Sequence, residues 1–179
     1  VQENAYRTLL NSFIDSHRSQ LKSIPPIYVI QWCNNLLTFG KFFRVSIYNI
    51  LNEVCIGIAV TSELYPYYLK SLLRLDKLKT LNSEFDRIQD DEWNEVLYDI
   101  QASYFIDIRQ YDQAKQVYQK FIHDSMSLQN WYNYIFCCSK TDESLVLAQK
   151  ELRKIPESLF SIDTKGFDFF IVQVANFID

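Results

Sequence analysis

The sequence predicts an all-α fold in which short helices pack as antiparallel hairpins. Apolar residues make up 48% of the 179 positions, and they recur mostly at the three- and four-residue spacing of amphipathic helices. Only 3 glycines and 4 prolines are present, too few for the regular turns of a sheet protein. Short helices joined by tight loops pack side by side on their apolar faces, so an array of helical hairpins is expected.

Residues 1–57 are expected to form N-terminal helical hairpins of degenerate pattern. Pro25 and Pro26 end the first helix, because a proline ring cannot continue the helical hydrogen-bond ladder. Gly40 is the expected C-terminal cap of the second helix. The three helices expected here span about residues 6–21, 28–39 and 41–55.

The middle of the chain, residues 62–155, carries further apolar stripes. Gly57 marks the turn before it, and Thr61 or Ser62 is the expected N-cap of the next helix. The acidic run at 90–92 has the character of a helix N-terminus, where carboxylates meet the positive end of the helix dipole. The stripes lie within residues 64–75, 78–88, 93–108, 111–121, 131–138 and 145–152.

The nearly all-apolar segment FDFFIVQVANFI closes the chain as one more expected helix. Polar residues interrupt it, so we expect a buried or partner-covered helix rather than a membrane anchor. The longest uninterrupted apolar run, VCIGIAV, is far shorter than the roughly 20 residues of a membrane helix, so this fragment is not expected to insert into a membrane. We interpret residues 164–179 as a terminal docking or capping helix of a single helical-repeat domain that spans residues 1–179.

Charge and composition argue against a nucleic-acid partner. The net charge is −4 and the sequence pI is near 5.2, whereas a domain that binds the phosphate backbone usually shows a basic patch. The most basic stretch, KSLLRLDKLK at residues 70–79, interleaves its charges with leucines at helical spacing, so we interpret it as a solvated helix face. DNA is not expected as a partner.

The cysteines indicate a reducing compartment. Cys33, Cys55, Cys137 and Cys138 have neither metal-like nor disulfide-framework spacing, so buried free thiols are expected. The protein is therefore expected to be intracellular, with the cytoplasm as the first expectation. The sequence begins at Val1 rather than Met and shows no signal peptide, so we treat it as a fragment that can lack flanking targeting or anchoring segments.

No residue pattern points to catalysis, a metal or a cofactor. The glycines are scattered, which excludes a glycine-rich phosphate loop. His17 and His123 lack Cys or acidic partners at ligand spacing, so no metal site is expected. The acidic run EFDRIQDDEWNE is interpreted as solvated, since general acid–base catalysis needs a protected carboxyl group. We expect that the chain is not an enzyme and uses no cofactor.

An alanine-centred pattern repeats along the chain. Ala114 and Ala148 are 34 residues apart (148 − 114 = 34). One period earlier the pattern fits with a one-residue slip, which places Leu81 and Phe85 in the positions of Ala114 and Tyr118. Repeats of this length are typical of stacked helical hairpins.

The segment EVLYDIQASYFIDIRQYDQAKQVYQKF, residues 95–121, resembles one unit of the tetratricopeptide-repeat (TPR) family. In that family small residues stand where the two helices of a pair cross, and aromatic residues fill the space beside them. Small side chains let two helix axes approach to about 8–10 Å. Phe121, Met126 and Phe136 depart from the family pattern. The residues that match it are Tyr98, Ala102, Phe105, Tyr111, Ala114 and Tyr118.

The resemblance implies a short right-handed solenoid, a TPR-like superhelix, whose concave groove holds a peptide or helix of another protein. Asp99 stands where carboxylate-binding members of the family have a lysine, so a partner with basic character is expected. The chain would be a non-catalytic scaffold or adaptor, one subunit of a larger intracellular complex. Exposed residues of the first helices would line the groove, namely Glu63, Lys70, Arg74, Asp99, Ser103, Asp107, Asn130, Asn133 and Lys140.

A second resemblance leaves an alternative open. Tyr132-Asn133, the following Ile135 and the CCSK at 137–140 look similar to a pentatricopeptide repeat. Such arrays bind single-stranded RNA, one base per repeat, through polar side chains of the first helix. Asn133 would be the base-reading residue, and the chain would be an RNA-binding protein of an organelle. The acidic charge of the chain argues against this alternative.

Overall fold

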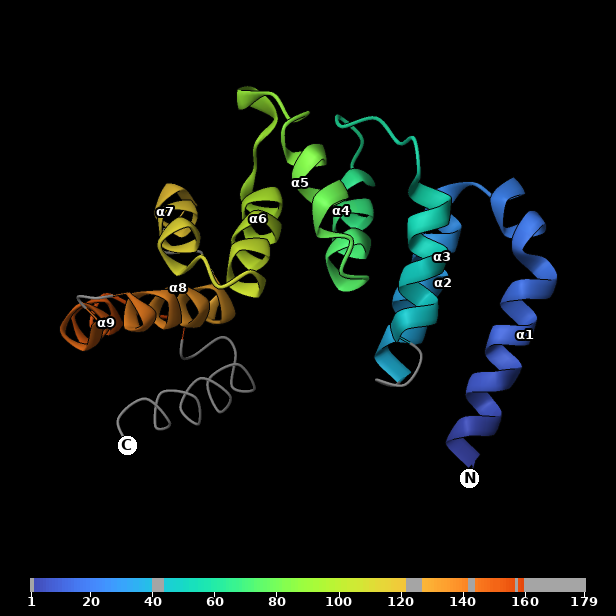
Figure 1. Cartoon of the computed structure of the whole chain (residues 1–179), viewed down its shortest axis with the longest axis horizontal. Coiled ribbons are helices and arrows are strands. Elements are labelled where there is room, and N and C mark those ends of the chain that lie inside the picture. The colour runs from blue at the N-terminus through green and yellow to red at the C-terminus, as the bar shows by residue number, and fades with distance from the viewer. Residues whose placement is uncertain (1, 40–43, 122–126, 142–143, 157, 160–179) are drawn as a thin grey trace. The chain divides into compact units, whose positions relative to one another are not determined.

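The computed structural model describes residues 2–39, 44–121, 127–141, 144–156 and 158–159, and every regular element among them is a helix (Figure 1). The all-α prediction is confirmed for this part of the chain. Gly40, His123 and the predicted terminal helix at 164–179 lie outside it. The elements are α1 (Gln2–Ser23), α2 (Pro26–Phe39), α3 (Arg44–Cys55), α4 (Tyr65–Arg74), α5 (Leu78–Phe85), the 3₁₀ helix η2 (Asp90–Glu92), α6 (Glu95–Asp107), α7 (Tyr111–Phe121), α8 (Leu128–Lys140) and α9 (Ser144–Leu152).

The chain divides into two compact units, Val1–Trp93 and Asn94–Asp179. In the first unit α1 packs on α3, and α2 packs on α3, α3 on α4, and α4 on α5 (Figure 1). Burial of one large aliphatic side chain contributes about 1.5–3 kcal/mol, so these contacts stabilise helices too short to persist alone. Its fully buried aliphatic side chains include Ile47, Leu51, Leu69, Leu72 and Leu81.

In the second unit α6 packs on α7, α7 on α8, and α8 on α9. Ala102 on α6 and Ala114 on α7 are completely buried, and Ala148 on α9 is 4% exposed. These alanines belong to one core cluster with Tyr118 and Trp131. The prediction that the alanines lie inside, at helix contacts, is confirmed. Packing of sequential helices is also confirmed, whereas a right-handed solenoid and a single domain over residues 1–179 stay predictions.

Two helix starts differ from the sequence prediction. Pro26 opens α2, because its fixed φ suits the first helical turn and its missing N–H would have no helical partner there. Asn94 caps α6, and its Oδ1 accepts hydrogen bonds from the N–H groups of Val96 (3.1 Å) and Leu97 (3.2 Å). The acidic run at 90–92 forms a separate short 3₁₀ helix instead of opening α6.

The start of α4 differs as well. Leu64 occupies its N-cap position and makes no side-chain cap. Ser62 lies two residues earlier, where its Oγ accepts a hydrogen bond from the Leu64 N–H at 3.2 Å. Ser62 therefore holds the turn before the helix rather than capping the helix itself.

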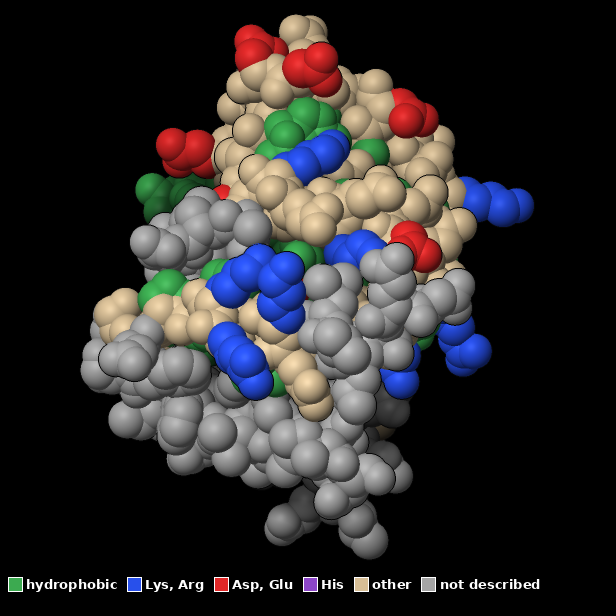
Figure 2. Space-filling view, turned by 90° about the vertical axis from the view of Figure 1, so that its left-hand side faces the viewer, with side chains coloured by type: hydrophobic (Ala, Val, Ile, Leu, Met, Phe, Trp, Pro, Cys, Tyr) green, Lys and Arg blue, Asp and Glu red, His purple; other side chains and the backbone are tan. Residues whose placement is uncertain are grey.

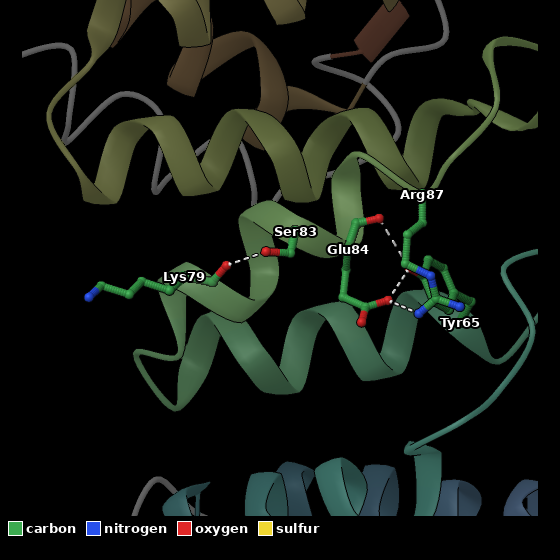
Figure 3. A network of polar contacts seen from close by, with 5 residues as sticks. All are labelled: Tyr65, Lys79, Ser83, Glu84 and Arg87. Carbon is green, nitrogen blue, oxygen red and sulfur yellow. Dashed lines mark hydrogen bonds and ion pairs between the residues drawn. The ribbon is translucent and has the colours of Figure 1, made fainter.

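Two polar contacts connect helices of the first unit. The buried Tyr65 hydroxyl on α4 donates to Glu84 Oε2 on α5 at 2.7 Å, and Arg87 Nη1 donates to the same oxygen at 2.6 Å (Figure 3). Burial and the bond to Glu84 raise the pKa of Tyr65, so the hydroxyl stays a donor. Lys77 Nζ donates to Oδ1 of the buried Asn52 on α3 at 2.6 Å. These contacts join α4 to α5, and α3 to the turn before α5.

Candidate binding surface

The groove residues predicted in the first unit all lie at the surface. Glu63 is exposed in the turn before α4, and Lys70 and Arg74 are exposed on α4, one helical turn apart. The spacing places the two cations on the same face of α4. Whether they contribute to a groove stays a prediction.

Three groove residues predicted in the second unit come together around one hydroxyl group. Asp99 and Ser103 are four residues apart on α6, Asn133 lies on α8, and all three are half-buried. Each lies close enough to the hydroxyl of Tyr118, on α7, to change its pKa. We call these four residues the Tyr118 cluster.

The Tyr118 hydroxyl is buried without a partner. The residue is 0% exposed, and no hydrogen bond to its hydroxyl is formed within the described residues. Burial raises its pKa, the Asp99 carboxylate raises it further, and the side chains of Asn133 and Ser103 lower it. The last two side chains therefore approach the hydroxyl without reaching hydrogen-bond geometry. The hydroxyl stays protonated at neutral pH and remains able to donate.

Aromatic packing holds the Tyr118 ring in place. Its centroid lies 5.4 Å from that of Phe121 and 6.4 Å from that of Tyr134, the latter ring nearly edge-on. Tyr98 of α6 stacks on Phe121 at 5.8 Å, and Lys120 Nζ lies 5.6 Å from the Tyr98 ring centroid. Rings of α7 and α8 thus pack directly against Tyr118, and Tyr98 of α6 packs on one of them.

Helix caps set the register of the two helices that carry the other members of the cluster. Asn94 caps the start of α6. Asp99 and Ser103 are four residues apart on this helix, so they lie one turn apart on the same face. Ser127 begins α8, since its Oγ accepts from the Asn130 N–H at 3.2 Å. The spacing from this cap sets the position of Asn133 on the helix.

The other predicted groove residues of this unit lie apart from the cluster. Asp107 is exposed at the end of α6, whereas Asn130 is buried, at 9% exposed, and not exposed as predicted. The backbone N–H of Asn130 donates to the Ser127 cap, and the residue lies in the core rather than at the surface. Lys140 is exposed, with Nζ 5.4 Å from the Phe136 ring centroid, and lines an open depression with Arg109 and the start of α7.

Positive charge in this unit gathers on another helix. Lys150 on α9 is exposed, as are Arg153 and Lys154 just after it. Figure 2 shows Lys and Arg side chains gathered near the middle of the face on the side of α7 and α9. Lys154 Nζ pairs with Glu151 Oε1 at 2.7 Å. The Tyr118 cluster carries the carboxylate of Asp99 instead, so its charge is of the opposite sign.

Sequence reasoning treated Tyr118 only as a packing aromatic and missed its hydroxyl. One signal was available, because a buried tyrosine usually brings its hydroxyl to a hydrogen-bond partner whereas phenylalanine needs none. That signal does not identify the partner. The four residues of the cluster come from three helices, and only the packing of these helices brings them together.

Within the described ranges, no cluster of three or more His, Cys, Asp or Glu side chains has the arrangement of a metal site. The same residues include no helix with the length and apolar character needed to cross a membrane. Cys33, Cys55, Cys137 and Cys138 are all buried free thiols, as predicted. Burial raises the pKa of Cys33 and Cys137 to about 12 and that of Cys55 to about 11, so these thiols are poor nucleophiles.

Comparison of the chain with protein-family models, with curated proteins and with solved structures finds no match.

Proposed function

We propose that the chain is a non-catalytic scaffold or adaptor that binds another protein through the face formed by α6 and α8. The observation that supports this proposal is the convergence of Asp99, Ser103 and Asn133 around the Tyr118 hydroxyl. Arrays of paired helices typically bind a peptide or helix through the side chains of their first helices. The protein would then serve as one helical-repeat subunit of a larger intracellular complex.

The chemistry of the surface favours binding over catalysis. A nucleophilic mechanism needs an activated group beside a base, and the buried thiols have pKa values raised away from activation. The Tyr118 hydroxyl likewise stays protonated, so it can donate a hydrogen bond but cannot act as a base at neutral pH.

A comparative pull-down with tagged residues 1–179, read by mass spectrometry, tests the proposal. Asp99→Arg reverses the charge in the Tyr118 cluster, and Asp112→Arg makes the same change at an exposed position on α7. Among the described residues Asp112 pairs with Lys115, at 3.2 Å on the surface, and such pairs contribute little to stability. We expect a protein that the wild type and Asp112→Arg both capture, and that Asp99→Arg loses while retaining its helical circular-dichroism spectrum.

Capture of the same proteins by all three versions would contradict the proposal, as would capture of none. Binding of pooled single-stranded RNA at two salt concentrations provides the second arm. Salt-sensitive, sub-micromolar binding to RNA would contradict the proposed protein partner and favour an RNA partner. Salt weakens such binding because phosphate contacts release counterions.

A further inference from the structure

A depression opens at the surface of the second unit, where the start of α7 meets the end of α8. Its volume is about 350 Å³, and no member of the Tyr118 cluster lines it. The lining residues, all exposed except the half-buried Tyr111, are Arg109, Gln110, Tyr111, Asp112, Gln113 and Lys140. A ligand can therefore reach it directly from solvent. We call it the Arg109 depression.

Aromatic contacts bring a cation from each side to this depression. The Tyr111 ring of α7 lies 5.6 Å from the Phe136 ring of α8, nearly perpendicular to it. Lys140 is one helical turn beyond Phe136, and its Nζ lies 5.4 Å from the centroid of the same ring. Packing of α7 on α8 thus places the Lys140 ammonium at the depression that Arg109 lines from the turn before α7.

Arg109 is an unusual residue for its position. Its φ of 62° lies in the left-handed region, where glycine is favoured over any residue with a side chain. Neither Arg109 nor Lys140 forms an ion pair with another described residue. An exposed cation in a strained conformation, without such a pair to stabilise the fold, suits a contact with a ligand.

The side chains around the depression define the chemistry of that ligand. A guanidinium donates two parallel hydrogen bonds to a carboxylate, and a lysine ammonium adds further donors. The amides of Gln110 and Gln113 can both donate and accept, as pairing with the N–H and C=O groups of a peptide backbone requires. Asp112 carries a negative charge at the rim, and it repels a doubly charged phosphate more strongly than a singly charged carboxylate.

We infer that the Arg109 depression binds a glutamate or aspartate side chain from an acidic peptide segment of another protein. Arg109 and Lys140 pair with the carboxylate, while Gln110 and Gln113 hold the adjoining peptide backbone. This inference goes beyond the proposed function, because it concerns a second surface whose ligand is opposite in charge to the partner expected at Asp99. Exposed ion pairs are individually weak, so one acidic residue binds weakly and serves as one contact of a longer segment.

Titration of the full chain with a peptide that carries one glutamate, acetyl-Gly-Glu-Gly-amide, tests the inference. The matched probe, acetyl-Gly-Gln-Gly-amide, has nearly the same shape and no charge. We expect saturable NMR shifts of the Gln110 and Gln113 backbone amides with the glutamate peptide, in the millimolar range, and none with the glutamine peptide. Equal shifts with both peptides, or no saturation with the glutamate peptide, would overturn the inference.

A phosphoserine peptide, acetyl-Gly-phosphoserine-Gly-amide, distinguishes a carboxylate from a phosphate ligand. Because Asp112 lies at the rim, we expect this peptide to bind no more tightly than the glutamate peptide. Tighter binding of phosphoserine would overturn the carboxylate assignment and favour a phosphorylated ligand. Asp112→Asn should tighten binding of the glutamate peptide about twofold, and weaker binding by this variant would contradict the inference.

A matched pair of lysine substitutions assigns the response to the depression. Lys140→Gln is expected to weaken binding of the glutamate peptide about fivefold, the upper end for one exposed ion pair. Lys120→Gln is the control, because Lys120 is also exposed, lies at the opposite end of α7, and has its Nζ 5.6 Å from an aromatic ring centroid. Equal weakening by both substitutions would indicate diffuse charge attraction and overturn the inference.

Arg109→Gly separates ligand binding from folding. Glycine suits the left-handed conformation, so the melting temperature of the variant should be unchanged or higher while the shifts with the glutamate peptide disappear. Retained binding would overturn the inference, as would loss of binding together with a lower melting temperature. Failure of the glutamate peptide leaves the proposed function standing, because Asp99-dependent capture of a protein does not involve this depression.

Discussion

Asp76 and Arg109 stand 33 residues apart (109 − 76 = 33) and share the same left-handed backbone conformation, with φ of 57° and 62°. Each follows the first helix of a hairpin, Asp76 after α4 and Arg109 after α6. In both turns the next residue donates back across the helix end, Lys77 to the Leu72 carbonyl at 2.9 Å and Gln110 to the Phe105 carbonyl at 2.8 Å. The two turns are thus locally alike, and their spacing agrees with the one-residue slip in the predicted repeat.

Arg109→Gly is expected to stabilise the protein by about 0.5–1 kcal/mol, because a side chain in the left-handed region is strained and glycine is not. Urea denaturation followed by circular dichroism measures the change. Arg109→Ala is the matched control, since it removes the same side chain but keeps the Cβ atom, and it should give no such gain. A glycine variant less stable than the alanine variant would contradict the prediction.

Ala114→Leu is expected to destabilise the protein by about 1–3 kcal/mol. Ala114 is completely buried on α7, which packs against α6, so a larger side chain must push the two helices apart. Gln113→Leu adds a similar side chain at the neighbouring exposed position and should change stability by less than about 0.5 kcal/mol. Equal effects of the two substitutions in urea denaturation would show that close helix approach at Ala114 is unimportant.

Asn94→Ala is expected to cost about 1 kcal/mol, because the first N–H groups of α6 lose the acceptor that the Asn94 side chain provides. Asn94→Asp and Asn94→Ser keep an acceptor at the same position and should retain most of the stability. Thermal melts of the three variants check the order. If aspartate and serine destabilise as much as alanine does, the cap is not the reason for the loss.

Alkaline pH is expected to destabilise the first unit through its buried thiols. Burial raises the pKa of Cys33 from its ordinary value of 9.0 to about 12, and a close Cys55 thiol adds to the shift. The folded state therefore holds the Cys33 proton more tightly than the unfolded state does. Stability is fully present below about pH 9 and is lost as pH rises from there towards about 12.

Urea midpoints between about pH 8 and about pH 11 measure this loss. Cys33→Ala should lower stability at neutral pH by leaving a small cavity, yet it should flatten the alkaline decline, since one buried thiol no longer titrates. An unchanged alkaline decline in that variant would assign the loss to other groups.

The helices and the buried alanines could be predicted from sequence because both follow from local pattern. Three- and four-residue apolar spacing indicated α4 to α8, and the position of Ala114 among tyrosines indicated a helix contact. Asn94 was missed because the acidic run before it offered a competing helix start. Pro26 was read only as a terminator, although the same ring geometry suits the first turn of α2.

The candidate site was only partly predictable. Asp99, Ser103 and Asn133 followed from the resemblance to helical repeats, whereas the Tyr118 hydroxyl between them depends on how three helices pack. Asn130 was expected to be exposed and is buried, since helical periodicity gives the face of a residue but not how deeply the neighbouring helix covers it. Contacts between distant parts of the chain decide both results.

Site-specific photo-crosslinking tests the central claim most directly. A photoreactive amino acid replaces Ser103, on the proposed binding face of α6, or Gln116, which is exposed on α7. In cells, or with the protein captured by pull-down, we predict a covalent adduct from position 103 and none from position 116. An adduct from position 116 alone, or none from either position while the partner remains bound, would contradict binding through the face of α6 and α8.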